Sequence, residues 1–295
     1  MSGDLAARIE SWQPAPVESS DLLAVQRARD LANTLSLPPA QFPQDNGPLP
    51  LLWHWVYFQS WPGGEDVGDD GHPREGNFIP PLPHRRRMWA GGRLDVVRPL
   101  TIGAVARRRS SLACVRVKIG RTGELLVVTV RHELCQDDVV CLVEEQDVIY
   151  RRAATHAAAP TPAAVPGTTE PPGAVDEPVT HSWMQSLRPD PVLLFRFSAL
   201  MANAHRIHYD EPYARAVEGY RGVVVHGPLL AITMAQLVRA HDVREVRSFS
   251  YRLVSPAFVN ERLWVKGSLP SPGEASLAVS DQSDRPHATG RATFA

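Results

Sequence analysis

The stretch VVVHGPLLAITMAQLVRAH, residues 223–241, decides the fold of this chain. It predicts a turn followed by a long apolar helix, with Gly227 at the point where the loop enters the helix. A helix that is apolar nearly all round has to be buried and cannot lie on a surface. The neighbouring segments must therefore supply the layer that covers it.

These neighbouring segments predict an antiparallel sheet with a second helix. A helix-like run precedes the long helix at residues 192–205, and strand-like runs follow it at 243–254, 258–269, 274–282 and 286–295. Runs of this kind, separated by turn residues, are typical of an antiparallel sheet.

The first half of the chain has the same order of elements. A helical pattern at 19–37, with Ser19 or Ser20 as its N-cap, precedes a helix-like apolar and aromatic run, NGPLPLLWHWVYFQSW, at 46–61. Strand-like runs follow at 93–100, 105–119, 124–134 and 139–151. We interpret the chain as a duplicated α+β unit, in which each antiparallel sheet wraps round one long apolar helix.

A change of composition separates the two halves. The stretch AATHAAAPTPAAVPGTTEPPGAVDEP, residues 153–178, is rich in Ala, Pro, Thr and Gly and has no apolar periodicity, as is typical of a linker. We predict a first repeat at 1–152, a linker at 153–180 and a second repeat at 181–295.

Composition and charge narrow the class of protein. Of the 295 residues, 43% are hydrophobic and 21% charged, which is ordinary for a soluble globular protein. The formal net charge is −1, so we expect no nucleic-acid partner. The N-terminal stretch has no signal-peptide pattern, no apolar run is long enough to span a membrane, and the three cysteines show no CxxC spacing. We expect a cytoplasmic protein without a membrane partner.

Titratable side chains gather just before the long helix. The stretch NAHRIHYDEPY, residues 203–213, lies between two apolar segments and is either a solvated loop or an active site. His205 and His208 are spaced i, i+3, which raises the question of a metal site. No HExxH motif or set of Cys ligands accompanies them, and we predict no metal. Motifs for nucleotide or serine-hydrolase chemistry are also missing from the sequence.

A basic stretch, PHRRRMWAGGR, lies in the first half at residues 83–93. Arg85, Arg86 and Arg87 stand close to Trp89, and arginine binds phosphates and carboxylates in a bidentate manner. These arginines are candidates for holding the phosphates of a ligand or a free carboxylate. The alternative is a solvated run of charges.

Residues 203–229, NAHRIHYDEPYARAVEGYRGVVVHGPL, resemble the MaoC-like hot-dog hydratases and dehydratases of acyl thioesters. His208 falls on the catalytic His of that family and Gly227 on the glycine that opens the hot-dog helix. PPLPHRRRMWAGGRLDVVRPLTIG and VEEQDVIYR are similar to the two-repeat subgroup. That subgroup includes mesaconyl-C4-CoA (3-methylfumaryl-CoA) hydratases, itaconyl-CoA hydratases and type 2 hydroxyacyl-thioester dehydratases. The resemblance implies a double hot-dog fold.

The sequence departs from the wider family at two positions. Asn203 stands where the family has its catalytic Asp, and His205 stands where it has an Asn. The resemblance implies that His208 acts as general base and then as general acid, while Asn203 orients the water or the His. Asn203 alternatively caps the helix that precedes it. The backbone N–H of Gly227 would bind the thioester oxygen.

The resemblance further implies a substrate site without a cofactor. We expect substrate contacts from His205, Arg206 and His226, together with Arg85, Arg86, Arg87 and Trp89. The expected reaction is reversible hydration of a short enoyl-CoA, above all a C5 branched dicarboxylyl-CoA. The alternatives are a 3-hydroxyacyl-thioester dehydratase of fatty-acid synthesis, a thioester hydrolase, and a non-catalytic acyl-CoA-binding protein. A homodimer or higher homo-oligomer is a further expectation.

Overall fold

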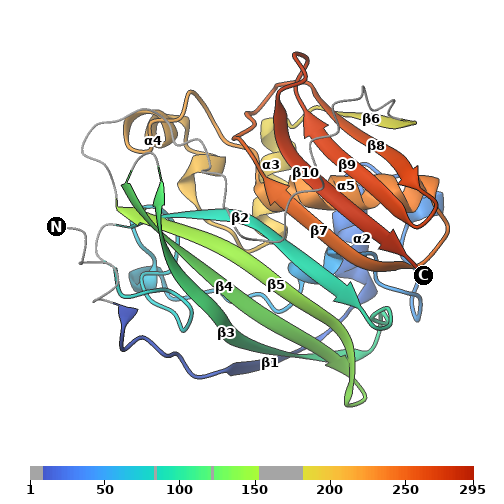
Figure 1. Ribbon diagram of the computed structural model, residues 1–295, viewed down its shortest axis with the longest axis horizontal. Helices are drawn as coiled ribbons and strands as arrows, with labels where there is room; N and C mark the ends of the chain where they lie inside the picture. The colour runs from blue at the N-terminus through green and yellow to red at the C-terminus, as the bar shows by residue number, and fades with distance from the viewer. Residues whose placement is uncertain (1–8, 83–84, 121–122, 153–181) are drawn as a thin grey trace.

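One continuous antiparallel sheet organises the chain (Figure 1). The computed structural model describes residues 9–82, 85–120, 123–152 and 182–295, and the whole of the predicted linker, 153–180, lies outside them. The first half contributes β1 (Val17–Leu22), β2 (Arg85–Val96), β3 (Val105–Gly120), β4 (Gly123–Gln136) and β5 (Val139–Arg152). The second half contributes β6 (Trp183–Leu187), β7 (Val246–Leu253), β8 (Leu263–Ser271), β9 (Glu274–Ser280) and β10 (Pro286–Phe294).

The strand order shows the duplication directly. It runs β1-β3-β4-β5-β2 through the first half and then β7-β10-β9-β8-β6 through the second, so the second half repeats the first in reverse. The halves join where β2 pairs with β7, with Gly91 opposite Arg252 and Asp95 opposite Ser248. The predicted α+β double hot-dog architecture is confirmed.

Along the chain, the helices of each half lie between its first and second strands, β1 and β2 in the first half and β6 and β7 in the second. They are α2 (Val25–Thr34), α3 (Pro191–Leu200), α4 (Glu211–Ala216) and α5 (Gly227–His241), with short 3-10 turns η1 (Pro39–Gln41), η2 (Trp53–Val56), η3 (Gly64–Asp66) and η4 (Arg206–His208). α5 is the predicted long helix. Leu229, Ala231 and Leu237 are fully buried, and the helix contacts β6 to β10. The second sheet therefore wraps round α5 as expected.

The first half lacks the predicted counterpart of α5, and this part of the prediction was wrong. Residues 46–61 form only the four-residue turn η2. Leu52 has a φ of 67°, which no α-helix accommodates, and the aromatic and β-branched residues after it are weak helix formers. The run is nevertheless buried, with Trp53 and Val56 almost fully covered. Hydrophobicity thus indicates burial correctly but not the helix.

The start of the first repeat also differs from the prediction. Ser19 and Ser20 do not cap a helix but lie in β1, opposite Arg108 and Arg107 of β3. α2 begins only at Val25. β1 uses the backbone groups that β3 would otherwise leave unpaired at the edge of the sheet. β2 begins at Arg85, which places the basic stretch on a strand.

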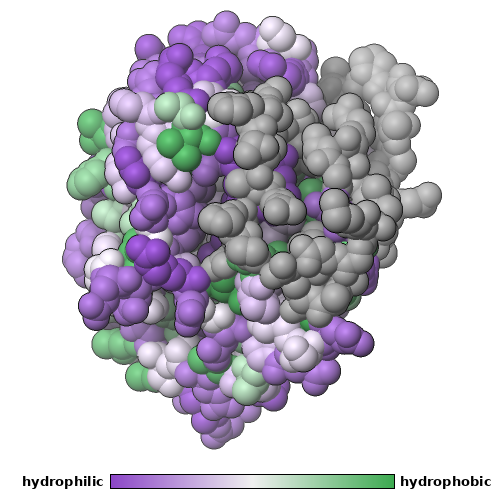
Figure 2. All heavy atoms as spheres, turned by 90° about the vertical axis from the view of Figure 1, so that its left-hand side faces the viewer, coloured by the Kyte–Doolittle hydropathy of each residue, from purple (hydrophilic) through white to green (hydrophobic). Residues whose placement is uncertain are grey.

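The surface seen in Figure 2, the left-hand side of Figure 1, presents mostly hydrophilic side chains among the described residues. No helix in the described ranges is long and apolar enough to cross a membrane. Many of the large apolar residues form a core that extends across both halves and includes Trp53, Phe197 and Phe249.

Candidate active site

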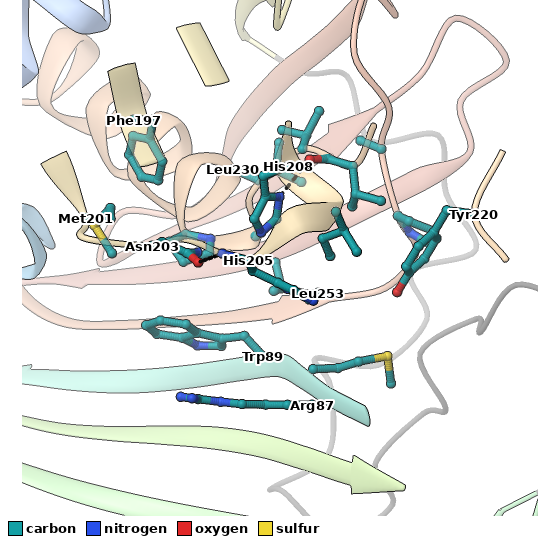
Figure 3. A pocket seen from close by; sticks show the side chains of 18 of the residues that line it. Arg87, Trp89, Phe197, Met201, Asn203, His205, His208, Tyr220, Leu230 and Leu253 are labelled. Atoms are coloured by element: carbon teal, nitrogen blue, oxygen red, sulfur yellow. Dashed lines mark hydrogen bonds between the residues drawn. The ribbon is translucent and has the colours of Figure 1, made fainter. Parts of the chain in front are cut away.

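A cavity of about 300 Å³ lies between the two halves of the chain (Figure 3). The first half contributes β2 and the loop around His72. The second half contributes the segment after α3, the start of α5 and the end of β7. Junctions of this kind are common places for ligand sites.

His208 ends the 3-10 turn η4 and lines the cavity. Its Nδ1 lies 2.8 Å from the carbonyl oxygen of Val224, which can only accept, so Nδ1 carries the proton. Nε2 is therefore left with its lone pair. Burial lowers the pKa of His208 to about 4, against the effect of the Val224 hydrogen bond. The ring is neutral near pH 7 and able to take up a proton at Nε2.

A second buried histidine holds the ring of His208 from one side. The imidazole of His226 stacks on it, with ring centroids 3.7 Å apart. Nε2 of His226 lies 2.8 Å from Ser198 Oγ on α3, and burial keeps the pKa of His226 well below its ordinary value. His226 is fully buried and is not among the cavity-lining residues. It fixes the position of the His208 ring.

Asn203 lies just beyond the end of α3. Met201 is the C-cap of that helix, and Ala202 has a φ of 47°, so the chain turns sharply there. The backbone N–H of Asn203 donates to Ser198 O, and its side-chain Oδ1 accepts the N–H of His205 at 3.0 Å. Asn203 thus shapes the loop through its side-chain oxygen. It also lines the cavity, and this hydrogen bond does not use its side-chain NH₂ group.

A loop from the first half packs against this segment. His72 lies with its ring centroid 4.1 Å from that of His205, and its Nδ1 is 3.1 Å from Asp70 Oδ2. Arg206 N donates to Asp70 O. Gly71 lies so close that a Cβ there would be 1.8 Å from Ala204 O. His72 lines the cavity but was missed in the sequence, where only the turn-like GDDGHP marks it.

Three side chains in this loop contact have the donor types that a metal ion needs. The donor atoms of Asp70, His72 and His205 all lie within 4.8 Å of one another. The pair considered from sequence is arranged differently, because the rings of His205 and His208 meet edge to face and Nδ1 of His208 is bound to Val224 O.

Gly227 is the first residue of α5 and lines the cavity. Its N–H has no acceptor within the helix, since the first four N–H groups of a helix never do, and the helix dipole favours negative charge there. The absence of a Cβ also has a packing reason, because a Cβ would come within 2.1 Å of Leu253 Cδ1.

The candidate arginines have different surroundings. Arg87 and Trp89 line the cavity, and the Trp89 indole donates to Tyr251 Oη at 2.9 Å. Arg86 instead bonds Glu218, with Nε 3.2 Å from Oε2, and the carbonyl of Val217. Arg85 is the first residue of β2 and lies opposite Arg152 of β5.

The structure therefore brings together six of the predicted site residues, namely Asn203, His205, His208, Gly227, Arg87 and Trp89. Arg206 is turned away, paired with Asp210 at 2.7 Å and bonded to Asp69 O. Arg86 and Arg206, like His226, do not line the cavity.

Solved structures share this fold. A MaoC-like dehydratase from Phytophthora capsici superposes with a TM-score of 0.70 at 13% identity, over 98% of both chains. HtdX of Mycobacterium tuberculosis gives a TM-score of 0.63 at 14% identity, over 95% of this chain and all of that one. At these identities the likeness shows the fold, which is that of the MaoC-like hot-dog proteins.

The sequence comparisons give the family. The model of the hydroxyacyl-thioester dehydratase type 2 family matches residues 52–259. The chain is 43% identical to a mesaconyl-C(4)-CoA hydratase of Chloroflexus aurantiacus, over 84% of both proteins. It is 26% identical to the mitochondrial hydroxyacyl-thioester dehydratase type 2 of Schizosaccharomyces pombe, over 72% of this chain and 75% of that protein. The chain belongs to the hydroxyacyl-thioester dehydratase type 2 family, and is therefore a hydro-lyase.

Proposed function

We propose that the protein reversibly hydrates a short, branched dicarboxylyl enoyl-CoA, with mesaconyl-C4-CoA as the favoured substrate and citramalyl-CoA as the product. The observation that carries this proposal is the tautomer of His208, which leaves the lone pair on Nε2. His208 lines a cavity whose volume suits an acyl group. The 43% identity to a mesaconyl-C(4)-CoA hydratase supports this substrate over itaconyl-CoA.

The reaction needs one base, one acid and one site for negative charge. Nε2 of His208 takes a proton from water as the water oxygen bonds to the β-carbon of the enoyl group. The electron pair of the double bond moves toward the thioester, and the Gly227 N–H stabilises the charge on its oxygen. The protonated His208 then delivers its proton to the α-carbon. No proton is gained or lost overall.

The supporting residues position these groups. His226 and Ser198 hold the plane of the His208 ring, and Val224 O fixes its tautomer. Asn203 orients the water, taking the position that an Asp has in the wider family. In this proposal the second repeat carries the catalytic groups, while the first supplies Arg87, Trp89 and His72 to the acyl pocket and does no chemistry. Other expectations are a cytoplasmic location, which the free cysteines favour, and a homo-oligomer.

The S. pombe relative supports a second candidate, dehydration of 3-hydroxyacyl thioesters in fatty-acid synthesis. A non-catalytic acyl-CoA-binding protein would bind these thioesters without turnover, and a thioesterase would release free thiol.

One panel separates these functions. Purified protein is assayed with crotonyl-CoA, longer enoyl-CoAs, mesaconyl-C4-CoA and itaconyl-CoA, with products followed by mass spectrometry. We expect hydration of mesaconyl-C4-CoA to dominate, and to fall by ~10²-fold or more in His208→Ala. His241→Ala, at the far end of α5, is the matched control and should stay active. Preference for long enoyl chains would favour the fatty-acid alternative.

A further inference from the structure

Arg87 is the charged residue of the acyl cavity. Among the described residues that line the cavity, it is the only Asp, Glu, Lys or Arg. The remaining lining is apolar, as Phe197 and Leu253 are, or neutral and polar, as Asn203 and Ser255 are. A guanidinium remains protonated at every physiological pH. The cavity therefore carries a permanent positive charge and no carboxylate side chain of its own.

Arg86 and Arg93, two other arginines on β2, are neutralised by acidic side chains, but Arg87 is not. Arg86 pairs with Glu218, and Arg93 pairs with Glu145 and Asp147. Across the described residues, Arg87 makes no ion pair with an acidic side chain. A partly buried cation without a partner is costly in a folded protein, because its lost hydration is not replaced. This cost is offset when a bound ligand supplies the anion.

The position of Arg87 shows which part of a ligand it can meet. Arg87 and Trp89 lie on the β2 side of the cavity, and His205 and His208 lie on the opposite side (Figure 3). The charge of Arg87 reaches across, since it contributes to the low pKa of His205, after burial and the neighbouring histidines His72 and His208. A cavity of about 300 Å³ holds an acyl group but not the nucleotide end of coenzyme A.

We propose that Arg87 is the receptor for a free carboxylate on the acyl chain, which it binds as a bidentate ion pair against the face of the cavity formed by Trp89. This inference rests on the proposed function and narrows it to a carboxylate-bearing acyl group. In mesaconyl-C4-CoA the carboxylate is attached to the β-carbon, the atom that water attacks. An arginine at this place fixes the β-carbon relative to Nε2 of His208, so it selects the substrate and orients it.

Binding without turnover tests this role independently of the proposed reaction. Two saturated thioesters are compared by calorimetry: 3-carboxybutanoyl-CoA and isovaleryl-CoA, which has a methyl group in place of the carboxylate. Wild type should prefer the carboxylate ligand, and Arg87→Met should reduce that preference by ~10²-fold, as expected for loss of a charge-assisted bidentate pair. Arg87→Lys keeps the charge without the planar fork and should be intermediate.

Arg116→Met is the matched control, because Arg116 is an exposed strand arginine of the same sheet outside the cavity. Its preference should equal that of wild type. Equal weakening of both ligands by Arg87→Met would overturn the proposal and assign Arg87 to the coenzyme A moiety. An unchanged preference would also overturn it. The wild-type protein could also fail to hydrate both mesaconyl-C4-CoA and crotonyl-CoA. If Arg87→Met still lost the preference for the carboxylate ligand, the carboxylate site would be retained and the proposed reaction rejected.

Discussion

The imidazole of His208 donates from Nδ1 to the carbonyl oxygen of Val224, 16 residues further along the chain, at 2.8 Å. Val224 in turn donates its N–H to Ile207 O at 2.8 Å, so the two segments are tied together on both sides of the ring. The tautomer of the proposed base is therefore set by the backbone and does not depend on a neighbouring carboxylate.

The low pKa of His208 predicts how activity depends on pH. The proposed base is active when neutral, and burial moves its pKa from about 6.5 to about 4. The acidic limb of kcat/KM should therefore lie well below pH 6.5, and activity should persist at pH 5.5. A pH–rate profile on mesaconyl-C4-CoA measures this. An acidic limb at pH 6.5 or above would contradict the assigned role of His208.

The stability of the fold should fall as the pH is lowered through the same range. Below pH 6.5 the unfolded chain protonates His208 while the folded chain does not until about pH 4, so the unfolded state binds more protons. As the pH is lowered from 6.5 to about 4, His208 should decrease the free energy of unfolding by up to roughly 1.4 kcal/mol per pH unit. Urea titrations at pH 7.0, 6.0 and 5.0 measure it. His208→Ala should show a smaller decrease, and an equal decrease would assign the effect to other groups.

Gly71 should be intolerant of a side chain. A Cβ would stand 1.8 Å from Ala204 O, which is backbone and cannot move aside cheaply, and the φ of Gly71 is 89°. Gly71→Ala should displace the segment that carries His205 and lower kcat by ~10-fold or more, in keeping with the sensitivity of catalysis to small misplacements. Gly273→Ala, where a Cβ meets nothing within 4 Å, is the control. Wild-type kcat in Gly71→Ala would show that this contact does not position the site.

Two substitutions at Asn203 separate its roles. Asn203→Asp keeps the oxygen that accepts the His205 N–H, whereas Asn203→Ala loses it. If the side-chain NH₂ orients water, both variants should lose ~10-fold or more in kcat, with a lower Tm only for the alanine variant. Wild-type kcat in Asn203→Asp would limit this residue to a structural role. Steady-state kinetics and thermal unfolding measure the two effects.

The pair of Arg86 and Glu218 ties the two halves together and can be tested by a double-mutant cycle. Burial raises the pKa of Glu218, against the effect of Arg86, and both side chains are largely covered. Arg86→Met leaves a buried carboxyl group without its cation and should cost ~3 kcal/mol. Arg86→Met with Glu218→Met should be much less costly. The Glu218→Met single variant completes the cycle. A loss in the double variant equal to the sum of the losses in the two single variants would show that the pair is not coupled.

Local patterns in the sequence predict most of the second repeat. The run from Gly227 to His241 forms the expected buried helix, and the four strands after it lie close to their predicted places. The first repeat is harder to predict. The run around Trp53 is also apolar, but the left-handed backbone of Leu52 prevents it from forming an α-helix. Hydrophobicity does not encode that conformation.

The site divides in the same way. Asn203, His205 and His208 lie in one short stretch and are visible as a motif. His72 lies 133 residues before His205 and reaches the cavity through tertiary contacts, among them the packing of Gly71 on Ala204. The acceptor for His208 is a backbone carbonyl, which every residue has, so no residue type reveals it. For Arg86 and Arg87, adjacent in sequence, only the tertiary structure distinguishes an internal ion pair from a cavity residue.

The pairing of β2 with β7 places both faces of the cavity on one polypeptide. In an assembly of two identical chains, any residue added to one face would appear again beside the second copy of the histidines. Here each half is free to diverge. One can keep its long central helix and the histidines at its entrance, while the other loses that helix and acquires a cation without placing a second one next to the base. The cavity also forms once per chain, whatever the protein concentration.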